Sequence, residues 1–300
     1  MNLIALFLKY IQYLLIRLAA LVYKLVPAYK AYNIAASITR LFYPVFKKRR
    51  AIAIDNILQA KITNDPKEAD RIARLAFGHL AGHVCEAMKA DQIITNDNWQ
   101  EHIELEMPES SRHLFYEELD QPIIMLGGHL GVWEAGVSSM ARSRPLIAIA
   151  RKMNNPFVER FLKATHFRQN ITIVDKNKGL TPSVLKQWKR TSATMAIVMD
   201  QHAGRKNGIM VDFMGRKAGT HTSPARLHLR TGVPIITATL IRKGPFDYTL
   251  IFDKPIRFQK TDDNDKDIRD LLTLINKQVE NMIRAYPEQY LWAHKRWRPE

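Results

Sequence analysis

Residues 123–134 read IIMLGGHLGVWE, and this stretch decides the fold class that we expect for the chain. The apolar run at 123–126 predicts a buried strand, the two glycines after it predict a turn, and a helical pattern covers residues 132–141. His129 therefore falls in a loop at the carboxyl end of a strand. Open α/β sheets bind their ligands at this position, so the loop is the first candidate for a functional site.

Strand and helix patterns alternate through the rest of the chain. Apolar or β-branched runs predict strands, and amphipathic stretches predict helices. The predicted strands are 123–126, 146–150, 171–174, 195–199, 235–241 and 248–252, and the predicted helices are 66–89, 132–141, 156–167, 182–189, 223–230 and 267–286. This alternation predicts an α/β fold with a mostly parallel central sheet flanked by helices.

The composition is that of an ordinary folded protein. Hydrophobic residues are 46% and charged residues 25% of the chain, which excludes a disordered or fibrous protein. Lys and Arg number 45 against 29 acids, a net charge of +16 that predicts a polyanionic partner. Nine basic residues and no acid lie within residues 1–50, the most apolar part of the chain, so we expect a membrane and not nucleic acid. The single cysteine, Cys85, suits a reducing compartment.

The first 26 residues form an apolar segment broken only by Lys9, Arg17 and Lys24. On a helix these cations fall within a sector of roughly 80°. One polar stripe on an apolar helix is typical of a helix lying among lipid headgroups, while a tilted span and a buried core helix are the alternatives. We expect residues 1–45 to form an amino-terminal membrane-anchoring helical segment, residues 46–300 a single α/β domain, and KKRR at 47–50 a basic cluster beside the membrane.

The candidate chemistry centres on histidine, because the chain contains no P-loop, GxGxxG, GxSxG, HExxH or paired CxxC motif. His129 and Glu134 are five residues apart, about 140° around an ideal helix, so they meet only if His129 stands outside the helix that carries Glu134. The glycines around His129 permit such a turn. His129 could then act as a general base oriented by Glu134, or it could stabilise the start of the helix alone.

Two other groups of histidines have weaker interpretations. His79, His83 and Glu86 lie on one face of the helix predicted at 66–89 and could form half of a metal site. A fourth ligand is missing, so we expect no metal ion. His113 and Glu118 repeat the five-residue spacing in an acidic segment without a glycine turn, and we expect them on the solvated surface.

The chain resembles the bacterial lipid A biosynthesis acyltransferases, the late enzymes that add secondary acyl chains to lipid A, from about residue 12 to residue 298. The HxxxxE element at 129–134 is shared with the wider glycerolipid acyltransferases. The MDQHAGRK stretch at 199–206 and the carboxyl-terminal tail at 287–297 are more specific to this family. Departures from the family pattern are Met214, Lys295 and Trp297. The matching features are KKRRAIAIDNI at 47–57, Glu86, HxxxxE at 129–134, Arg151 with Asn155, Arg168, MDQHAGRK at 199–206, Phe213 with Gly215 and Thr220, and PEQYLWAHKRW at 287–297.

The resemblance implies transfer of a fatty acyl chain from acyl carrier protein to a hydroxyl of a primary acyl chain on a phosphorylated, anionic lipid A precursor. It places the reaction at the cytoplasmic face of the bacterial inner membrane and implies no cofactor beyond the acyl carrier protein thioester as donor. The rival interpretations are an acyltransferase for another glycerolipid or glycolipid, and a non-catalytic scaffold that binds anionic lipid.

The resemblance also implies roles for individual residues. His129 would be the general base with Glu134 as its partner, and Arg205 and Lys206 would bind acceptor phosphate. Asp200 and Gln201 end a predicted strand and could orient His129, orient the acceptor or cap the next turn. The residues expected to bind substrate are Arg151, Arg168, Asp200, Gln201, Arg205 and Lys206.

Overall fold

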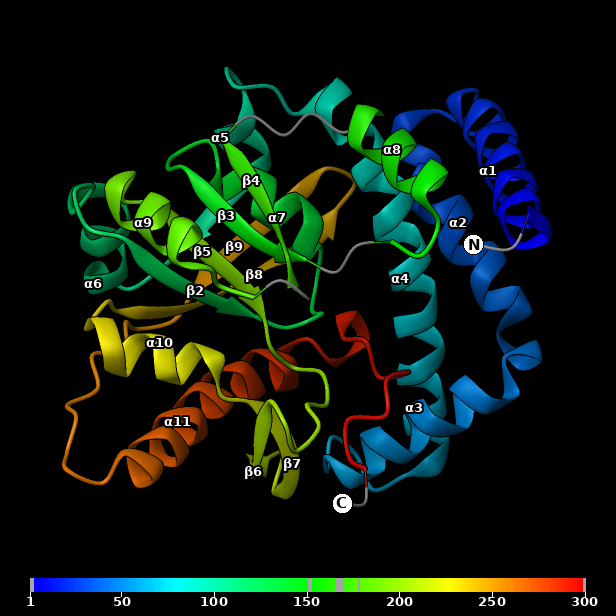
Figure 1. Cartoon of the computed structure of the whole chain (residues 1–300). Helices are drawn as coiled ribbons and strands as arrows, with labels where there is room; N and C mark the ends of the chain where they lie inside the picture. Colours follow the sequence, from blue (N-terminus) through cyan, green and yellow to red (C-terminus); the bar gives the residue numbers. More distant parts are fainter. Residues whose placement is uncertain (1–2, 151–152, 166–169, 177–178, 299–300) are drawn as a thin grey trace.

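The computed structural model describes residues 3–150, 153–165, 170–176 and 179–298 (Figure 1). Within them, one sheet contains seven strands: β1 (Ile103–Glu106), β2 (Ile123–Gly127), β3 (Leu146–Ala150), β4 (Ile171–Asp175), β5 (Thr194–Val198), β8 (Ile235–Gly244) and β9 (Asp247–Phe252). Their order across the sheet is β1-β9-β8-β2-β5-β3-β4. The β8–β9 pair is antiparallel and the other neighbours are parallel, which confirms the predicted mostly parallel sheet.

Helices cover both faces of this sheet. The α-helices from residue 66 onward are α4 (Pro66–Ile93), α5 (Trp99–His102), α6 (Glu109–Arg112), α7 (Trp133–Met140), α8 (Pro156–Thr165), α9 (Pro182–Arg190), α10 (Ser223–Thr231) and α11 (Asn264–Ala285). Successive side chains of a strand point to opposite faces, so Ile123 and Met125 of β2 pack with Met140 of α7, while Ile124 and Leu126 pack with helices α9, α10 and α11. Because β2 is buried on both faces, its sequence is a continuous apolar run.

Most of the predicted elements are present, with ends that shift by a few residues. The start of α9 is as predicted: Thr181 caps the helix by accepting a hydrogen bond from the Val184 N–H at 3.4 Å, and Pro182 is its first residue. Strand β1 and the hairpin of β6 (Gly208–Phe213) and β7 (Arg216–His221) were not predicted. The hairpin turns at Met214 and Gly215, both with positive φ, and this pair lacks the Asn-Gly signal of such turns.

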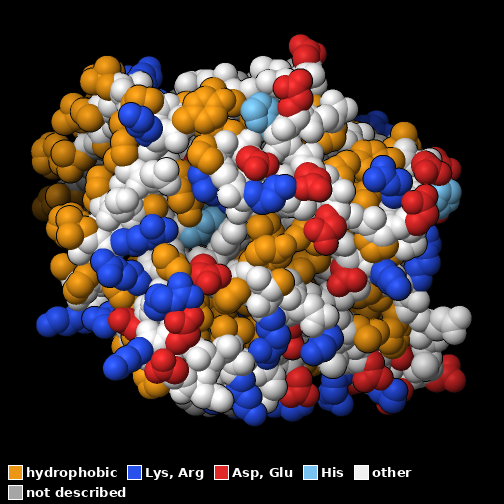
Figure 2. Space-filling view, turned by 180° about the vertical axis from the view of Figure 1, so that it is seen from behind, with side chains coloured by type: hydrophobic (Ala, Val, Ile, Leu, Met, Phe, Trp, Pro, Cys, Tyr) orange, Lys and Arg blue, Asp and Glu red, His pale blue; other side chains and the backbone are white. Residues whose placement is uncertain are grey.

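Three helices come before α4: α1 (Leu3–Lys24), α2 (Ala28–Phe42) and α3 (Lys47–Gln59). Residues 4–24 are long and apolar enough to cross a membrane, with a mean hydropathy of 1.7, and none of this segment is buried. Helix α2 is amphipathic: Tyr32 is buried against α4, whereas Ile38 and Leu41 are exposed. Figure 2 shows hydrophobic side chains gathered along the edge of the molecule that α1 and α2 form, which we call the apolar edge.

Arg17 of the predicted cation stripe faces α8, and the backbone of α1 at Lys9 and Lys24 contacts other parts of the protein. Arg17 lies 5.9 Å above the Tyr13 ring and 6.0 Å from the Phe161 ring of α8. The Asn155 amide donates a 2.8 Å hydrogen bond to the carbonyl of Lys9, and Lys89 of α4 donates to the carbonyl of Lys24 at 3.3 Å. Large apolar side chains of α1 are exposed beside these cations, among them Phe7, Leu15 and Leu21. The anchoring role of the stripe and the domain boundary at residue 45 stay predictions, although α2 packs on α4 as part of the same fold.

The KKRR segment, which we expected to be a basic cluster beside the membrane, also makes contacts within the fold, and its place beside a membrane stays a prediction. It begins α3, and Arg50 forms a bidentate ion pair with Asp70 of α4 at 2.9 Å for each contact. Arg49 donates to the carbonyl of Ala293 in the carboxyl-terminal tail. Two of the four cations therefore join α3 to other parts of the fold, and Lys47 and Lys48 are exposed.

The turn after β2 passes very close to β8. Gly131 has φ +65°, and a Cβ at this position would lie 2.0 Å from the Leu240 carbonyl oxygen. The Val132 N–H donates to that same oxygen at 2.7 Å. Only glycine fits here, because both the backbone conformation and the space exclude a side chain.

We expect Gly131→Ala to destabilise the protein more than Gly232→Ala. Gly232 has a similar φ of +69° but no atom within 4 Å of the added Cβ, so its substitution costs only the conformational strain of about 1–2 kcal/mol. At Gly131 the backbone must also move, which adds about 1–3 kcal/mol. Thermal denaturation of the two variants measures the difference, and equal melting temperatures would contradict the close approach at Gly131.

Candidate active site

His129 and Asp200 meet at the carboxyl edge of the sheet. Strands β2 and β5 are parallel neighbours with Gly127 paired to Val198, so the residues that follow them emerge side by side. The Asp200 carboxylate accepts two hydrogen bonds from His129: one from the backbone N–H at 2.9 Å and one from ring Nδ1 at 2.8 Å. The carboxylate side chain is 2% exposed and the imidazole 22%.

This arrangement sets the tautomer of His129. Since Asp200 accepts at Nδ1, that nitrogen carries the proton and Nε2 presents a lone pair. The side-chain amide of Gln201 lies 3.3 Å from Nε2 and can donate to it. His129 is therefore held in the form that can remove a proton from a bound hydroxyl.

The two side chains also shift the pKa of each other. Burial lowers the pKa of His129, but the negative charge and hydrogen bond of Asp200 outweigh burial, so the net pKa is raised. Burial alone would raise the pKa of the Asp200 carboxyl, and the proximity of His129 and its hydrogen bonds reverses this, so that pKa is lowered. Asp200 is thus ionised at neutral pH and stabilises a protonated His129.

The carboxyl-terminal tail holds the His129 turn from the other side. The Leu291 N–H donates to the His129 carbonyl at 3.0 Å, and Leu130 pairs with Tyr290 as an isolated antiparallel bridge. The buried Tyr290 hydroxyl is hydrogen-bonded to Asp200. Sequence reasoning assigned no role to Tyr290; the structure places it directly behind the His129–Asp200 pair.

A cavity of about 410 Å³ opens beside His129 between α4, α7 and strands β3, β4 and β5. His129, Gln201 and Lys176 line it at the carboxyl edge of the sheet, and Arg142 lines it at the opposite edge, where its guanidinium donates to the Ile94 carbonyl at 3.1 Å. The rest of the lining is mostly small or apolar and includes Ala87, Ala90, Trp133, Ala148, Ile149, Ile171, Ile173, Ala196 and Val198. Its size and its mostly small or apolar lining with a few polar groups are typical of a ligand pocket.

The structure brings together only some of the predicted site residues. His129, Asp200 and Gln201 meet: Asp200 contacts the ring and the backbone N–H of His129, and its role toward an acceptor stays a prediction. Arg205 and Lys206 are exposed in the turn before β6, and the described residues that line the cavity do not include them.

Two predicted residues, and the side chain of a third, lie outside the part of the chain that the structure describes. Arg151 and Arg168 belong to segments outside the described residues. Glu134 lies in the first turn of α7, but its side chain is also outside the described part. The predicted contact between Glu134 and His129 therefore stays a prediction, while Asp200 occupies the ring nitrogen that we had expected Glu134 to bind.

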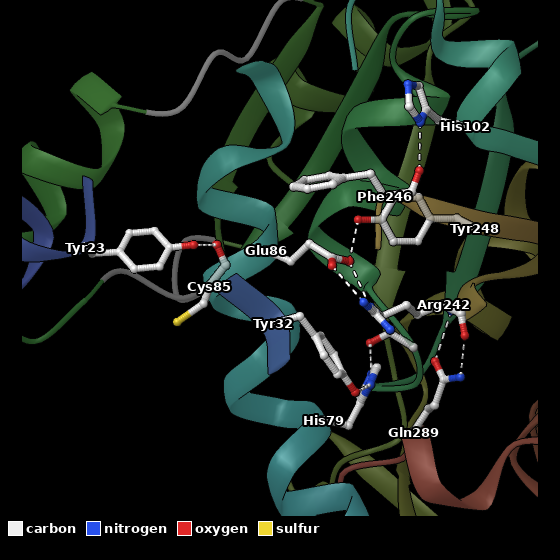
Figure 3. A network of polar contacts seen from close by, with 11 residues as sticks. Tyr23, Tyr32, His79, Cys85, Glu86, His102, Arg242, Phe246, Tyr248 and Gln289 are labelled. Atoms are coloured by element: carbon white, nitrogen blue, oxygen red, sulfur yellow. Dashed lines mark hydrogen bonds and ion pairs between the residues drawn. The ribbon is translucent and has the colours of Figure 1, made fainter. Parts of the chain in front are cut away.

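The histidines on α4 take part in other contacts. His79 is hydrogen-bonded to Tyr32 and to the Gly131 carbonyl, and Glu86 forms an ion pair with Arg242 (Figure 3). Across the described residues, no group of three or more His, Cys, Asp and Glu side chains could hold a metal ion. His113 is exposed and bonded to Glu117 and Glu118, as expected for a surface pair.

Comparison with known proteins gives a match along nearly the whole chain. The family model described as "Bacterial lipid A biosynthesis acyltransferase" matches residues 4–299. Among curated proteins, the chain is 26% identical to the lipid A biosynthesis palmitoleoyltransferase of Escherichia coli (strain K12) over 180 residues, 59% of this chain and 56% of that protein. It is also 26% identical over 184 residues to the lauroyltransferase of the same organism, 59% of this chain and 57% of the other.

A third relative and a solved structure show weaker similarity. The lipid A biosynthesis acyltransferase of Haemophilus influenzae is 23% identical over 193 residues, 62% of this chain and 58% of that protein. The matches thus span little more than half the length of the curated relatives. The 1-acyl-sn-glycerophosphate acyltransferase of Thermotoga maritima gives a TM-score of 0.37 at 11% identity, over 86% of this chain and 96% of that one.

We expect Asp200→Asn to lower the pKa of His129. In the native protein this pKa lies above its ordinary value of 6.5, because Asp200 outweighs burial. Removing the charge leaves burial as the main influence, so the pKa should fall below 6.5. Titration of 13C-labelled histidines by NMR measures the change, with the exposed His113 as an internal control whose pKa should not move. An unchanged His129 pKa would exclude the pairing.

Proposed function

Since the chain belongs to the family of bacterial lipid A biosynthesis acyltransferases, we propose that it transfers a fatty acyl chain to a hydroxyl of a lipid A precursor. The observation that carries this proposal is the His129–Asp200 pair at the rim of an apolar cavity. A general base beside an apolar pocket suits a reaction between a hydroxyl group and an activated fatty acid. The buried Asp200 carboxylate accepts two hydrogen bonds from His129. This argues against a scaffold that only binds lipid, because such a scaffold needs neither a general base nor a partner for it.

The proposed reaction starts from a fatty acyl thioester of acyl carrier protein. The acceptor hydroxyl takes the place of the Gln201 amide at His129 Nε2, which removes the hydroxyl proton as the oxygen attacks the thioester carbon. The tetrahedral intermediate collapses, the carbon–sulfur bond breaks, and the imidazolium returns the proton to the departing thiolate. Asp200 stabilises the imidazolium between these steps. The reaction forms one ester bond and releases one thiol, and it needs no cofactor.

Glu134 remains a proposed catalytic residue. Asp200 already binds Nδ1, and Nε2 is required for the acceptor, so Glu134 would act through its charge near the imidazolium or through a contact with substrate. The proposed phosphate-binding residues are Arg205 and Lys206 in the exposed turn after Gln201, with Arg151 and Arg168 as further substrate contacts.

The cavity is the proposed site of the fatty acyl chain. Its small and apolar lining offers an aliphatic chain contact without an unpaired polar group along most of its length. His129 lines the cavity, which supports a bound chain whose first carbon lies beside the proposed general base. The sequence did not predict this cavity, because its lining comes from five separate elements.

The proposed location is the cytoplasmic face of the bacterial inner membrane, with the apolar edge of α1 and α2 in contact with lipid. Leu15 and Leu18 of α1 are 62% and 59% exposed, and such a concentration of exposed apolar side chains is unusual on a soluble surface. The net charge of +16 would favour both anionic lipid and an acidic acyl carrier protein.

We expect His129→Ala and Asp200→Asn each to lower the rate of acyl transfer by about 10²–10⁴-fold, since a proton-transfer group contributes about this much. Asn at 200 would also direct an N–H at Nδ1 and so reverse the tautomer. Glu134→Gln should cause a comparable loss if its charge supports the imidazolium. The assay follows a labelled acyl chain from acyl carrier protein to the lipid A precursor.

His113→Ala is the matched control for this experiment, because His113 is an exposed histidine with its own carboxylate partners. Its activity should equal that of the unmodified protein. Near-normal acyl transfer by the folded His129→Ala variant would contradict the proposed function.

We expect the double variant Leu15→Glu, Leu18→Glu to lose binding to vesicles that contain anionic lipid, because two charges would enter the apolar edge. Co-sedimentation with vesicles measures the loss. Leu274→Glu on α11 is the control, since Leu274 is 49% exposed but lies on another helix. Equal binding by the double variant and the control would exclude the apolar edge as the membrane contact.

A further inference from the structure

A buried polar network connects α2 and α4 to the turn that carries His129 (Figure 3). At its centre, Arg242 of β8 donates two hydrogen bonds of 2.9 Å to Glu86 of α4. The Tyr248 hydroxyl donates to the same carboxylate at 2.7 Å, so Glu86 is fully buried with three bonds. Glu86, Arg242 and Tyr248 are not among the described residues that line the cavity beside His129, and the proposed reaction uses none of them.

The network continues from Arg242 to His79. The Arg242 guanidinium lies 3.6 Å from the centre of the Tyr32 ring, which fixes that ring on the inner side of α2. The Tyr32 hydroxyl lies 3.1 Å from His79 Nδ1. His79 Nε2 lies 3.1 Å from the carbonyl oxygen of Gly131.

The chemistry of these atoms sets the direction of each bond. Burial lowers the pKa of His79 to about 4, so the ring is neutral at physiological pH and has one N–H. A carbonyl can only accept, so the N–H is on Nε2 and points at Gly131. Nδ1 is therefore an acceptor, and the Tyr32 hydroxyl donates to it.

Both sides of Gly131 are tied to this network. While its carbonyl accepts from His79, its N–H donates to the Gln289 carbonyl at 3.0 Å. The Gln289 side chain in turn bonds the backbone N–H and carbonyl of Arg242 at 3.1 and 2.9 Å. Gly131 is two residues from His129, and its positive φ makes the direction of the turn depend on how its peptide groups are held.

We infer that Tyr32 and His79 are positioning residues for His129, held in place by the Glu86–Arg242 pair, and that they set the geometry of the general base through the Gly131 carbonyl. The inference rests on the proposed function, because it assumes that His129 is the base. A buried ion pair is weak evidence for stability, since apolar side chains of similar size often serve as well. The Glu86–Arg242 pair is connected to the His129 turn through the Tyr32 ring and the His79 imidazole. We therefore assign it a role in positioning these two side chains.

The decisive variant is Tyr32→Phe. It keeps the ring under Arg242 and removes only the hydroxyl that donates to His79 Nδ1. The His79 ring then loses one of the two hydrogen bonds that hold it, and only its Nε2–H bond to the Gly131 carbonyl remains. The less firmly held imidazole gives the turn more freedom, and no cavity opens in the core.

We expect Tyr32→Phe to lower kcat for acyl transfer about three- to tenfold with KM unchanged, which corresponds to the loss of one neutral hydrogen bond. The pH profile of kcat/KM should also move. A looser turn weakens the contact of His129 with Asp200, the group that raises its pKa, so the acid limb should shift to lower pH. The other titratable groups facing His129 are Lys176, His83 and His294, and none contacts Tyr32 in the structure as described.

His79→Ala and His79→Gln form the second pair. The alanine variant should lose more activity than Tyr32→Phe, and the glutamine variant should recover most of it, because its amide can donate to the Gly131 carbonyl in place of Nε2. Tyr29→Phe is the control on the same helix, since Tyr29 is exposed and packs on Phe246, outside the bonds to Gly131.

The outcomes separate this inference from the proposed function. Folded Tyr32→Phe and His79→Ala variants with normal kcat and an unmoved pH profile would overturn the inference. A lower melting temperature with an unmoved pH profile would overturn it too, since that result describes a structural role only. If His79→Ala does not fold, Tyr32→Phe alone decides. Activity in His129→Ala would instead overturn the proposed function.

Discussion

The Asp200 carboxylate binds the backbone N–H and the ring of His129 together, and the site depends on this double contact. The backbone bond closes the turn after β2, and the ring bond sets the tautomer. A rotation of the turn would break both bonds, so the fold of the turn and the tautomer of the imidazole are coupled. The tail contributes from behind, where Tyr290 is buried against the same carboxylate.

Charged groups are buried in several places, and each has partners that offset the cost of removing it from water. Glu86 has Arg242 and Tyr248, and Arg296 in the tail donates to Gly219 and Thr220 while its guanidinium lies 4.7 Å from the Phe213 ring. These bonds join segments that are far apart in the chain. They give the loops around His129 fixed positions, which apolar packing alone specifies less tightly.

The apolar edge and the site are connected through the same helices. Helix α2 turns Ile38 and Leu41 outward and Tyr32 inward, so one helix carries both an exposed apolar surface and a bond toward the His129 turn. Helix α1 lies against α8, and Asn155 before α8 binds its backbone. The amino-terminal helices are thus joined to the sheet by specific contacts, although they are its most exposed apolar part.

The sequence by itself determined the parallel sheet, its helices and the loop position of His129, because alternating burial and helical periodicity are local properties of a chain. It also marked Asp200 and Gln201, but it could not choose their role. Only the tertiary structure decided that Asp200, 71 residues from His129, is the acid on Nδ1, because that depends on β5 lying next to β2 in the sheet. The cavity and the link from Tyr32 to Gly131 are likewise set by the packing of separate elements, which no single stretch of residues specifies.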